Sequence, residues 1–127
     1  MDYTIRNLSS TTDLAPQFGF GDNGEAHFPR EEIGATETGL AYLVLKPGRR
    51  SPFGHRHDEA EEVYVVISGD GRMRLDEEIV EIGALDAIRV APKITRAFEA
   101  GPEGMTVLAF GARHEGDGEV LPDFWRD

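Results

Sequence analysis

Short apolar runs separated by glycine, proline and acidic residues occupy the middle of the chain. Their apolar positions alternate or stand in short unbroken blocks, as in β-strands, and no stretch has the spacing of an amphipathic helix. The pattern predicts about eight short strands, spaced as in an all-β sandwich or barrel. The expected strands cover residues 40–45, 52–57, 62–68, 72–76, 79–82, 86–90, 95–100 and 105–110.

Glycine-containing segments between these runs are expected to be turns. Gly69-Asp70-Gly71 has the composition of a hairpin turn between the strands 62–68 and 72–76. Gly101-Pro102 is expected to turn the chain between the last two strands.

Two of the expected strands are apolar on both faces. One face of 62–68 carries Glu62, Tyr64 and Val66, and the other carries Val63, Val65 and Ile67. A barrel wall with one solvated side needs only one apolar face. We therefore expect the outer face to be covered by the N-terminal segment or by a second copy of the chain, and we expect a homodimer.

The N-terminal residues 1–39 are expected to form an arm that packs on a barrel made by residues 40–112. Glycine and proline rule out a long helix between Leu14 and Phe28. The aromatic residues of this stretch are expected to anchor the arm, and they are Phe18, Phe20 and Phe28. We expect His27 to be a surface histidine of the arm.

The C-terminal tail, residues 113–127, is rich in glycine and acidic residues and is expected to be a loop. Leu121, Phe124 and Trp125 are expected to dock on the body or on a partner. His114 follows the last strand, where it is either a lid residue at the mouth of a pocket or a solvated loop residue.

Length and charge narrow the function classes. The chain has 127 residues, enough for one domain with a core, and its 13 basic and 24 acidic residues give a net charge of −11. Such a chain is repelled by nucleic acids and anionic membranes, so neither is an expected partner. There is no cysteine, which excludes disulfides and thiolate metal sites. With no signal pattern and no long apolar run, a cytoplasmic location is expected.

His55 and His57 are the first candidates for chemistry. Residues at i and i+2 point to the same side of a strand, whereas on a helix they diverge. Glu62 follows at the start of the strongest predicted strand. Two imidazoles and one carboxylate directed at one place form a ligand set for a divalent transition metal such as Fe, Mn, Zn or Ni.

These residues lie in a pattern that resembles the first motif of the cupin family. Here it runs from Gly48 through His55-Arg56-His57 and Glu62 to Gly69, with the first gap one residue longer than usual. Glu61 is a rival for the carboxylate, but Glu62 has the family's spacing to the closing glycine. The resemblance covers residues 40–112 and implies an all-β, double-stranded β-helix (jelly-roll) cupin barrel.

The second cupin motif is degenerate. Pro92 and its strand are present, but Arg96 stands where the family has its fourth metal ligand, a histidine. A guanidinium cannot lose its proton and cannot ligate a metal. If it points inward, its charge lowers the affinity of the site for a metal ion.

Three interpretations of the site stay open. In a metal site, the ion would be held by three protein ligands only, as in some catalytic sites. In a metal-free site, Arg96 and the histidines would bind a carboxylate or phosphate ligand. The candidate residues that contact such a ligand are Arg96, Tyr64, Met73, Phe98 and Phe110. In a structural site, Arg96 pairs with Glu62 or Glu61 inside the barrel.

The sequence thus predicts a protein that binds a small, anionic molecule, with or without a divalent metal. A metal-dependent dioxygenase, isomerase or decarboxylase is the enzymatic alternative implied by the cupin resemblance, and a metal-free relic site with a structural or interaction role is the other. The fold alone does not choose among these activities.

Overall fold

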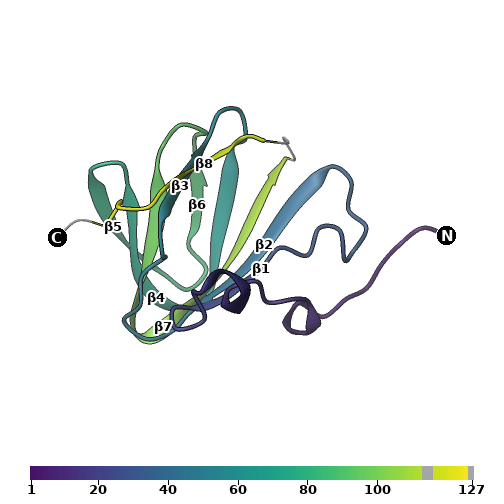
Figure 1. The fold of residues 1–127 in the computed structure, drawn as a ribbon, viewed down its shortest axis with the longest axis horizontal. Coiled ribbons are helices and arrows are strands. Elements are labelled where there is room, and N and C mark those ends of the chain that lie inside the picture. Colours follow the sequence, from purple (N-terminus) through teal and green to yellow (C-terminus); the bar gives the residue numbers. More distant parts are fainter. Residues whose placement is uncertain (113–115, 126–127) are drawn as a thin grey trace.

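Eight antiparallel strands form one strongly curved sheet in the computed structural model, which describes residues 1–112 and 116–125 (Figure 1). The strands are β1 (Gly24–His27), β2 (Thr38–Leu45), β3 (Gly54–His57), β4 (Glu62–Leu75), β5 (Glu78–Gly83), β6 (Ala87–Val90), β7 (Arg96–Ala112) and β8 (Gly118–Leu121). Two 3₁₀ turns, η1 (Leu8–Ser10) and η2 (Pro16–Phe18), precede them. The described residues contain no α-helix, and none of their helical turns is long and apolar enough to cross a membrane.

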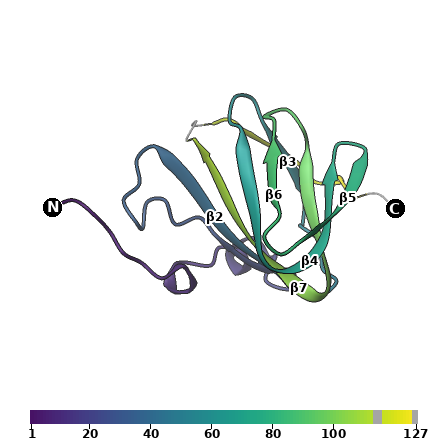
Figure 2. The same ribbon diagram turned by 180° about the vertical axis from the view of Figure 1, so that it is seen from behind.

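The long strands β4 and β7 organise the barrel, as the views from both sides show (Figures 1 and 2). They pair with each other along most of their length. In addition, β7 pairs with β2 and β3, and β4 pairs with β5 and β6. The predicted all-β, double-stranded β-helix fold is confirmed.

The prediction of turns inside these two strands was wrong. The chain does not reverse at residues 69–71 or 101–102 but bends through them, with register shifts between Val66 and Ser68 and between Gly69 and Gly71. A Cβ atom at Gly69 would lie 2.0 Å from the carbonyl oxygen of Gly104. The glycines therefore permit two bent strands to approach closely. In the sequence, a glycine-rich stretch of this kind looks the same as a hairpin turn.

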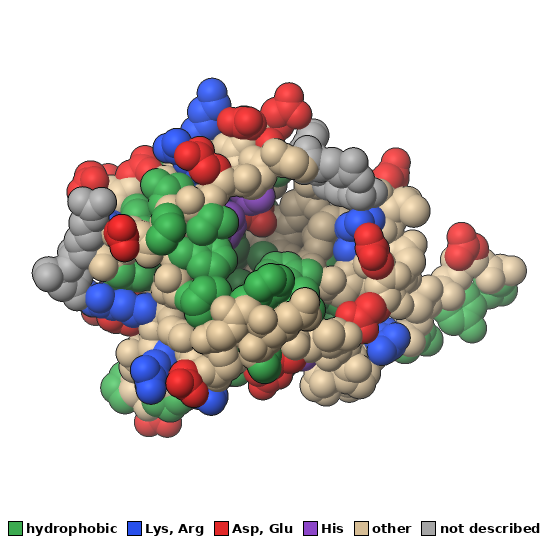
Figure 3. Space-filling view, viewed as in Figure 1, with side chains coloured by type: hydrophobic (Ala, Val, Ile, Leu, Met, Phe, Trp, Pro, Cys, Tyr) green, Lys and Arg blue, Asp and Glu red, His purple; other side chains and the backbone are tan. Residues whose placement is uncertain are grey.

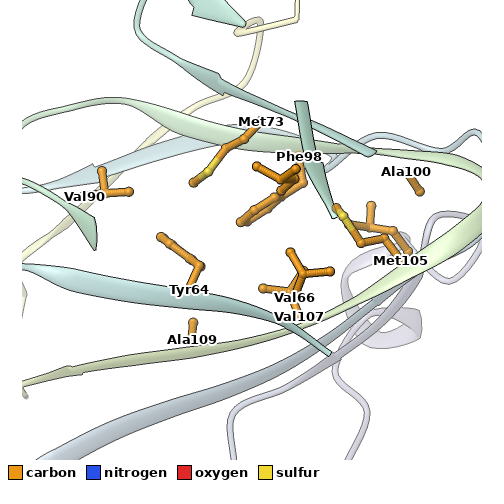
Figure 4. Packing of buried hydrophobic residues seen from close by; sticks show 11 residues of the cluster. Tyr64, Val66, Met73, Val90, Phe98, Ala100, Met105, Val107 and Ala109 are labelled. Carbon is orange, nitrogen blue, oxygen red and sulfur yellow. The ribbon is translucent and has the colours of Figure 1, made fainter. Parts of the chain in front are cut away.

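The inner faces of β4 and β7 form most of the core. Tyr64, Val66, Met73, Phe98 and Val107 are each at most 3% exposed and belong to one cluster (Figure 4). The predicted alternation of inward and outward side chains is confirmed at the start of β4. Before Met73, the bulges shift this alternation by one residue.

The N-terminal segment contributes a strand to the sheet, because β1 pairs with β2. The expectation that His27 is a surface residue was wrong, since this side chain, in β1, is only 1% exposed. Its ring packs 5.1 Å from the ring of Tyr42, and Thr11 and Glu25 lie within hydrogen-bond distance of its two nitrogens. The sequence missed this because the burial comes from the preceding segment folding back over β1.

The described part of the C-terminal segment contains a strand where only a loop was expected. Its strand β8 pairs with β3. The expectation that the tail docks on the body is confirmed at Phe124 and Trp125, whose rings lie under the guanidinium groups of Arg74 and Arg50 at 4.4 and 4.7 Å. The candidate lid residue His114 lies outside the described residues.

Candidate metal centre and binding cavity

His55 and His57, on β3, and Glu62, at the start of β4, come together inside the barrel. The two imidazole rings are 5.3 Å apart, centroid to centroid. The Nε2 atom of His55 lies 3.3 Å from Oε1 of Glu62, and that of His57 lies 3.1 Å from the same oxygen. The extended backbone of β3 places both rings on one side, as the spacing predicts, and the β3–β4 connection brings the carboxylate to them.

Tyr64 adds a hydroxyl group to this cluster. It lies two residues after Glu62, on the same face of β4, and its hydroxyl donates a hydrogen bond of 2.5 Å to Oε1 of Glu62. Burial and the neighbouring carboxylate raise the pKa of Tyr64 well above its ordinary value. The phenol therefore keeps its proton and acts as a donor.

Glu62 is held in its ionised form. Burial alone would raise the pKa of this carboxyl group, but hydrogen bonds from His55 and Tyr64 and the charges of the histidines outweigh burial and lower the pKa to about 2. Glu62 is therefore a carboxylate at neutral pH, which is the form in which it could bind a metal ion.

Arg96 lies behind the carboxylate and is completely buried. Its two terminal nitrogens donate to the backbone carbonyls of Pro92, at 3.3 Å, and Ala91, at 3.1 Å. Its Nε atom is 3.9 Å from Oε1 of Glu62 and makes no hydrogen bond within the described part of the chain. The guanidinium thus serves as a fixed positive charge beside Glu62, and each of its outer nitrogens donates one hydrogen bond to the backbone.

Asp117, just before β8, reaches the other side of His57. Its Oδ2 atom lies 3.4 Å from Nδ1 of the imidazole. The same carboxylate accepts hydrogen bonds from the backbone N–H groups of residues 58, 59 and 60. Burial would raise the pKa of Asp117, but these hydrogen bonds lower it. Sequence reasoning missed this residue, because one aspartate among several in an acidic tail carries no local signal.

The donor set fits a divalent transition metal. One nitrogen each from His55 and His57 and one oxygen from Glu62 all lie within 4.8 Å of one another. Two imidazoles and a carboxylate suit Fe, Mn, Zn or Ni. The positive charge of Arg96 opposes a bound cation, whereas the ionised state of Glu62 favours it.

A cavity of about 560 Å³ opens beside these residues. Figure 3 shows the hollow, with histidine and acidic side chains on its inner wall and hydrophobic side chains around it. Three of the predicted ligand-contacting residues, Tyr64, Arg96 and Phe98, line it. Met73 instead lies in the core, and Phe110 is 37% exposed; neither lines the cavity.

The N-terminal segment supplies much of the remaining wall. Phe18, Phe20 and Phe28, expected only as anchors of the arm, line the cavity together with Phe53. The ring centroids of Phe20 and Phe53 are 5.9 Å apart. The aromatic residues in this glycine-rich stretch were the available sign that the segment packs on the barrel. The sequence does not show that the segment folds across the cavity.

A second group of potential ligands consists of Asp13, Glu25 and His27. Both nitrogens of this histidine already have partners, with Nε2 lying 2.8 Å from Glu25. Oδ1 of Asp13 accepts hydrogen bonds from two backbone N–H groups, those of Ala15 and Ala26. We interpret this group as a structural network that fastens the N-terminal segment to β1.

Comparisons with known proteins agree with this architecture. The family model for the cupin domain matches residues 41–111, more than half of the chain. No curated protein sequence matches the chain.

Solved structures with this fold include a cupin protein from Bacteroides fragilis, with a TM-score of 0.72 and 21% identity over 100% of this chain and 98% of that one. A variant of Streptomyces PAC13, solved with uridine, has a TM-score of 0.71 and 19% identity, covering 96% of this chain and 93% of its own. The polyketide cyclase RemF from Streptomyces resistomycificus has a TM-score of 0.65 and 20% identity, with 81% and 72% covered. At these identities the likeness establishes the fold alone.

Proposed function

Since the chain belongs to the cupin family, we propose that its barrel binds a small molecule in the cavity, beside a divalent metal ion held by His55, His57 and Glu62. The observation that carries the proposal is the convergence of three ligand atoms from two strands next to a cavity of ligand size. Proteins commonly bind small molecules in mainly apolar cavities into which a few polar groups converge.

The side chains around the ion would have separate tasks. Tyr64 holds a proton at its hydroxyl group, 2.5 Å from the carboxylate. Asp117, whose Oδ2 atom lies 3.4 Å from Nδ1 of His57, would help to orient this imidazole, and Arg96 places a compensating positive charge beside Glu62. When bound, the metal would act as a Lewis acid that polarises an oxygen-containing group of the ligand. A metal-dependent isomerase, dioxygenase or decarboxylase is the enzymatic form of this proposal.

A metal-free binding site is the second candidate. The observation in its favour is the buried charge of Arg96, whose Nε lies 3.9 Å from Oε1 of Glu62. With hydrogen bonds from Tyr64 and the two histidines as well, the carboxylate is compensated without an ion. In this form the cluster would orient a ligand through hydrogen bonds.

Calorimetric titration with Mn²⁺ or Ni²⁺ separates the two candidates. Protein purified without a nickel resin and treated with chelator is expected to bind one ion per chain, and Glu62→Ala to bind none. The control is Glu61→Ala, which removes an adjacent exposed carboxylate that pairs with Arg89 at 3.1 Å. If the wild type takes up no ion, or if both variants behave alike, the metal site is refuted and the metal-free candidate stands.

We also propose that the outer face of the sheet pairs with a second copy of the chain. Val63 lies opposite Phe110 on this face, and Val65 lies opposite Leu108. Phe110 and Ile67 are 37% and 42% exposed. Light scattering is expected to give the mass of a dimer, and Phe110→Glu to give that of a monomer; a monomeric wild type would refute this assembly.

A further inference from the structure

The cavity has two chemically different ends. At the inner end lie His55, Glu62, Tyr64 and Arg96. The rest of its wall comes from the N-terminal segment, from β2, from residues 51–53 and from β7, and it is almost entirely apolar. A ligand that fills the cavity must therefore match a polar end and a long apolar wall.

The few polar side chains on the apolar wall are already engaged within the protein. The amide of Asn23 donates to the backbone carbonyl of Arg50 at 2.8 Å. The hydroxyl of Ser51 accepts a hydrogen bond from the backbone N–H of Phe98 at 2.9 Å. Glu25 lies 2.8 Å from His27. This wall is consequently a poor match for a ring of sugar hydroxyls, which would lose their water without gaining equivalent partners.

The cation in the wall is no better placed for a phosphate group. The terminal nitrogens of Arg96 are bonded to the carbonyls of Ala91 and Pro92, and the side chain is completely buried. Phosphate recognition by arginine requires the forked donors to face the ligand. Here each terminal nitrogen already donates a hydrogen bond to a backbone carbonyl.

The aromatic residues of the N-terminal segment, in contrast, are left uncovered. Phe18 and Phe28 both line the cavity and are still 63% and 54% exposed. Exposed apolar residues gathered around a hollow mark a surface that another apolar body covers. Phe20 and Phe53 continue the same wall.

From these observations we infer that the ligand is a mainly apolar, aromatic small molecule whose oxygen atoms are gathered at one end. The oxygen-bearing end lies at His55, Glu62 and Tyr64, and the rings lie against the phenylalanines of the N-terminal segment. This inference rests on the proposed small-molecule site and specifies its ligand class. It makes Phe18 a specificity-determining residue.

The test compares two anionic probes, 1-hydroxy-2-naphthoate and ribose 5-phosphate, by calorimetric titration. Each titration is run with chelator and again with Mn²⁺ present. Naphthoate is expected to bind at least about 100-fold more tightly than ribose 5-phosphate. Phe18→Ser is expected to weaken naphthoate binding about tenfold, because part of the apolar contact is lost. The control is Tyr3→Ser, which changes an aromatic residue that is 69% exposed and does not line the cavity.

The outcomes separate this inference from the metal site. Naphthoate binding that weakens in Phe18→Ser but not in Tyr3→Ser supports the inference, even where Mn²⁺ itself fails to bind. Absence of naphthoate binding in a protein that does bind Mn²⁺ overturns the inference and leaves the metal site intact. Ribose 5-phosphate binding as tightly as naphthoate, or Phe18→Ser binding naphthoate like the wild type, also overturns it.

Discussion

Oδ2 of Asp117 lies 3.4 Å from Nδ1 of His57, although the two residues are far apart in the sequence. The contact exists because β8, which begins at Gly118, pairs with β3 and places His57 opposite Gly118. The C-terminal segment thereby reaches the candidate metal centre from behind.

This contact predicts a role for Asp117 in orienting a metal ligand. A carboxylate behind a ligating imidazole fixes the orientation of its ring and raises its basicity. Asp117→Asn is expected to weaken Mn²⁺ binding by about 10- to 100-fold in calorimetric titration. The control, Glu119→Gln, removes an equally negative residue of β8 that pairs with Arg56 at the surface. Equal affinities in the two variants would show that only the net charge of the segment matters.

A second prediction concerns acid stability. The pKa of Glu99 is lowered because hydrogen bonds from Arg50 and Arg72 stabilise its carboxylate more than partial burial opposes it. The resulting stabilisation is fully present above the unfolded pKa, and it is lost as the pH falls through the lower pKa of the folded state. The free energy of unfolding of Glu99→Gln at pH 7 is expected to be about 1 kcal/mol lower than that of the wild type, after allowance for solvent screening.

Urea denaturation at stepwise lower pH checks this difference. It is expected to shrink on acidification and to disappear below the folded pKa of Glu99. Glu103→Gln, at an exposed position of the same strand β7, is the control and is expected to unfold like the wild type throughout. A difference for Glu99→Gln that stays constant from neutral to acid pH would contradict the ion-pair explanation.

The burial of His27 predicts that this residue matters for folding. Replacement by alanine removes its packing on Tyr42 and its contacts with Thr11 and Glu25. His27→Ala is expected to lower the free energy of unfolding by about 2–4 kcal/mol. Glu25→Gln keeps a hydrogen-bonding side chain and is expected to cost less than about 1 kcal/mol. Chemical denaturation that finds both variants equally stable would show that the network does not fasten the N-terminal segment.

The close approach of the two long strands yields a fourth prediction. Gly69 and Gly48 both have a left-handed backbone, with φ of 76° and 71°. A Cβ atom at Gly69 would collide with the carbonyl of Gly104, whereas one at Gly48 would meet no atom within 4 Å. Gly48→Ala is expected to cost about 1 kcal/mol of stability, and Gly69→Ala at least about 3 kcal/mol. Thermal unfolding that ranks the two variants equally would mean that the strands can separate at little cost.

Much of the site could be predicted because its residues lie close together in the sequence. His55 and His57 share a strand face, and Glu62 starts the next strand, so local spacing is enough to group them. Local spacing could not show whether the guanidinium of Arg96 donates hydrogen bonds to a ligand, as expected, or to the protein. Only the folded chain shows that its terminal nitrogens bond to the carbonyls of Ala91 and Pro92.

By itself, the sequence determined the all-β class, the inner face at the start of β4 and the cluster of His55, His57 and Glu62, since these depend on local alternation and short spacing. Only the tertiary structure decided that Phe18 lines the cavity, that Asp117 backs His57 and that the chain bends at Gly69 without reversing. These features arise from contacts between segments distant in the sequence. Such contacts depend on how the whole barrel closes, which no local pattern of polar and apolar residues records.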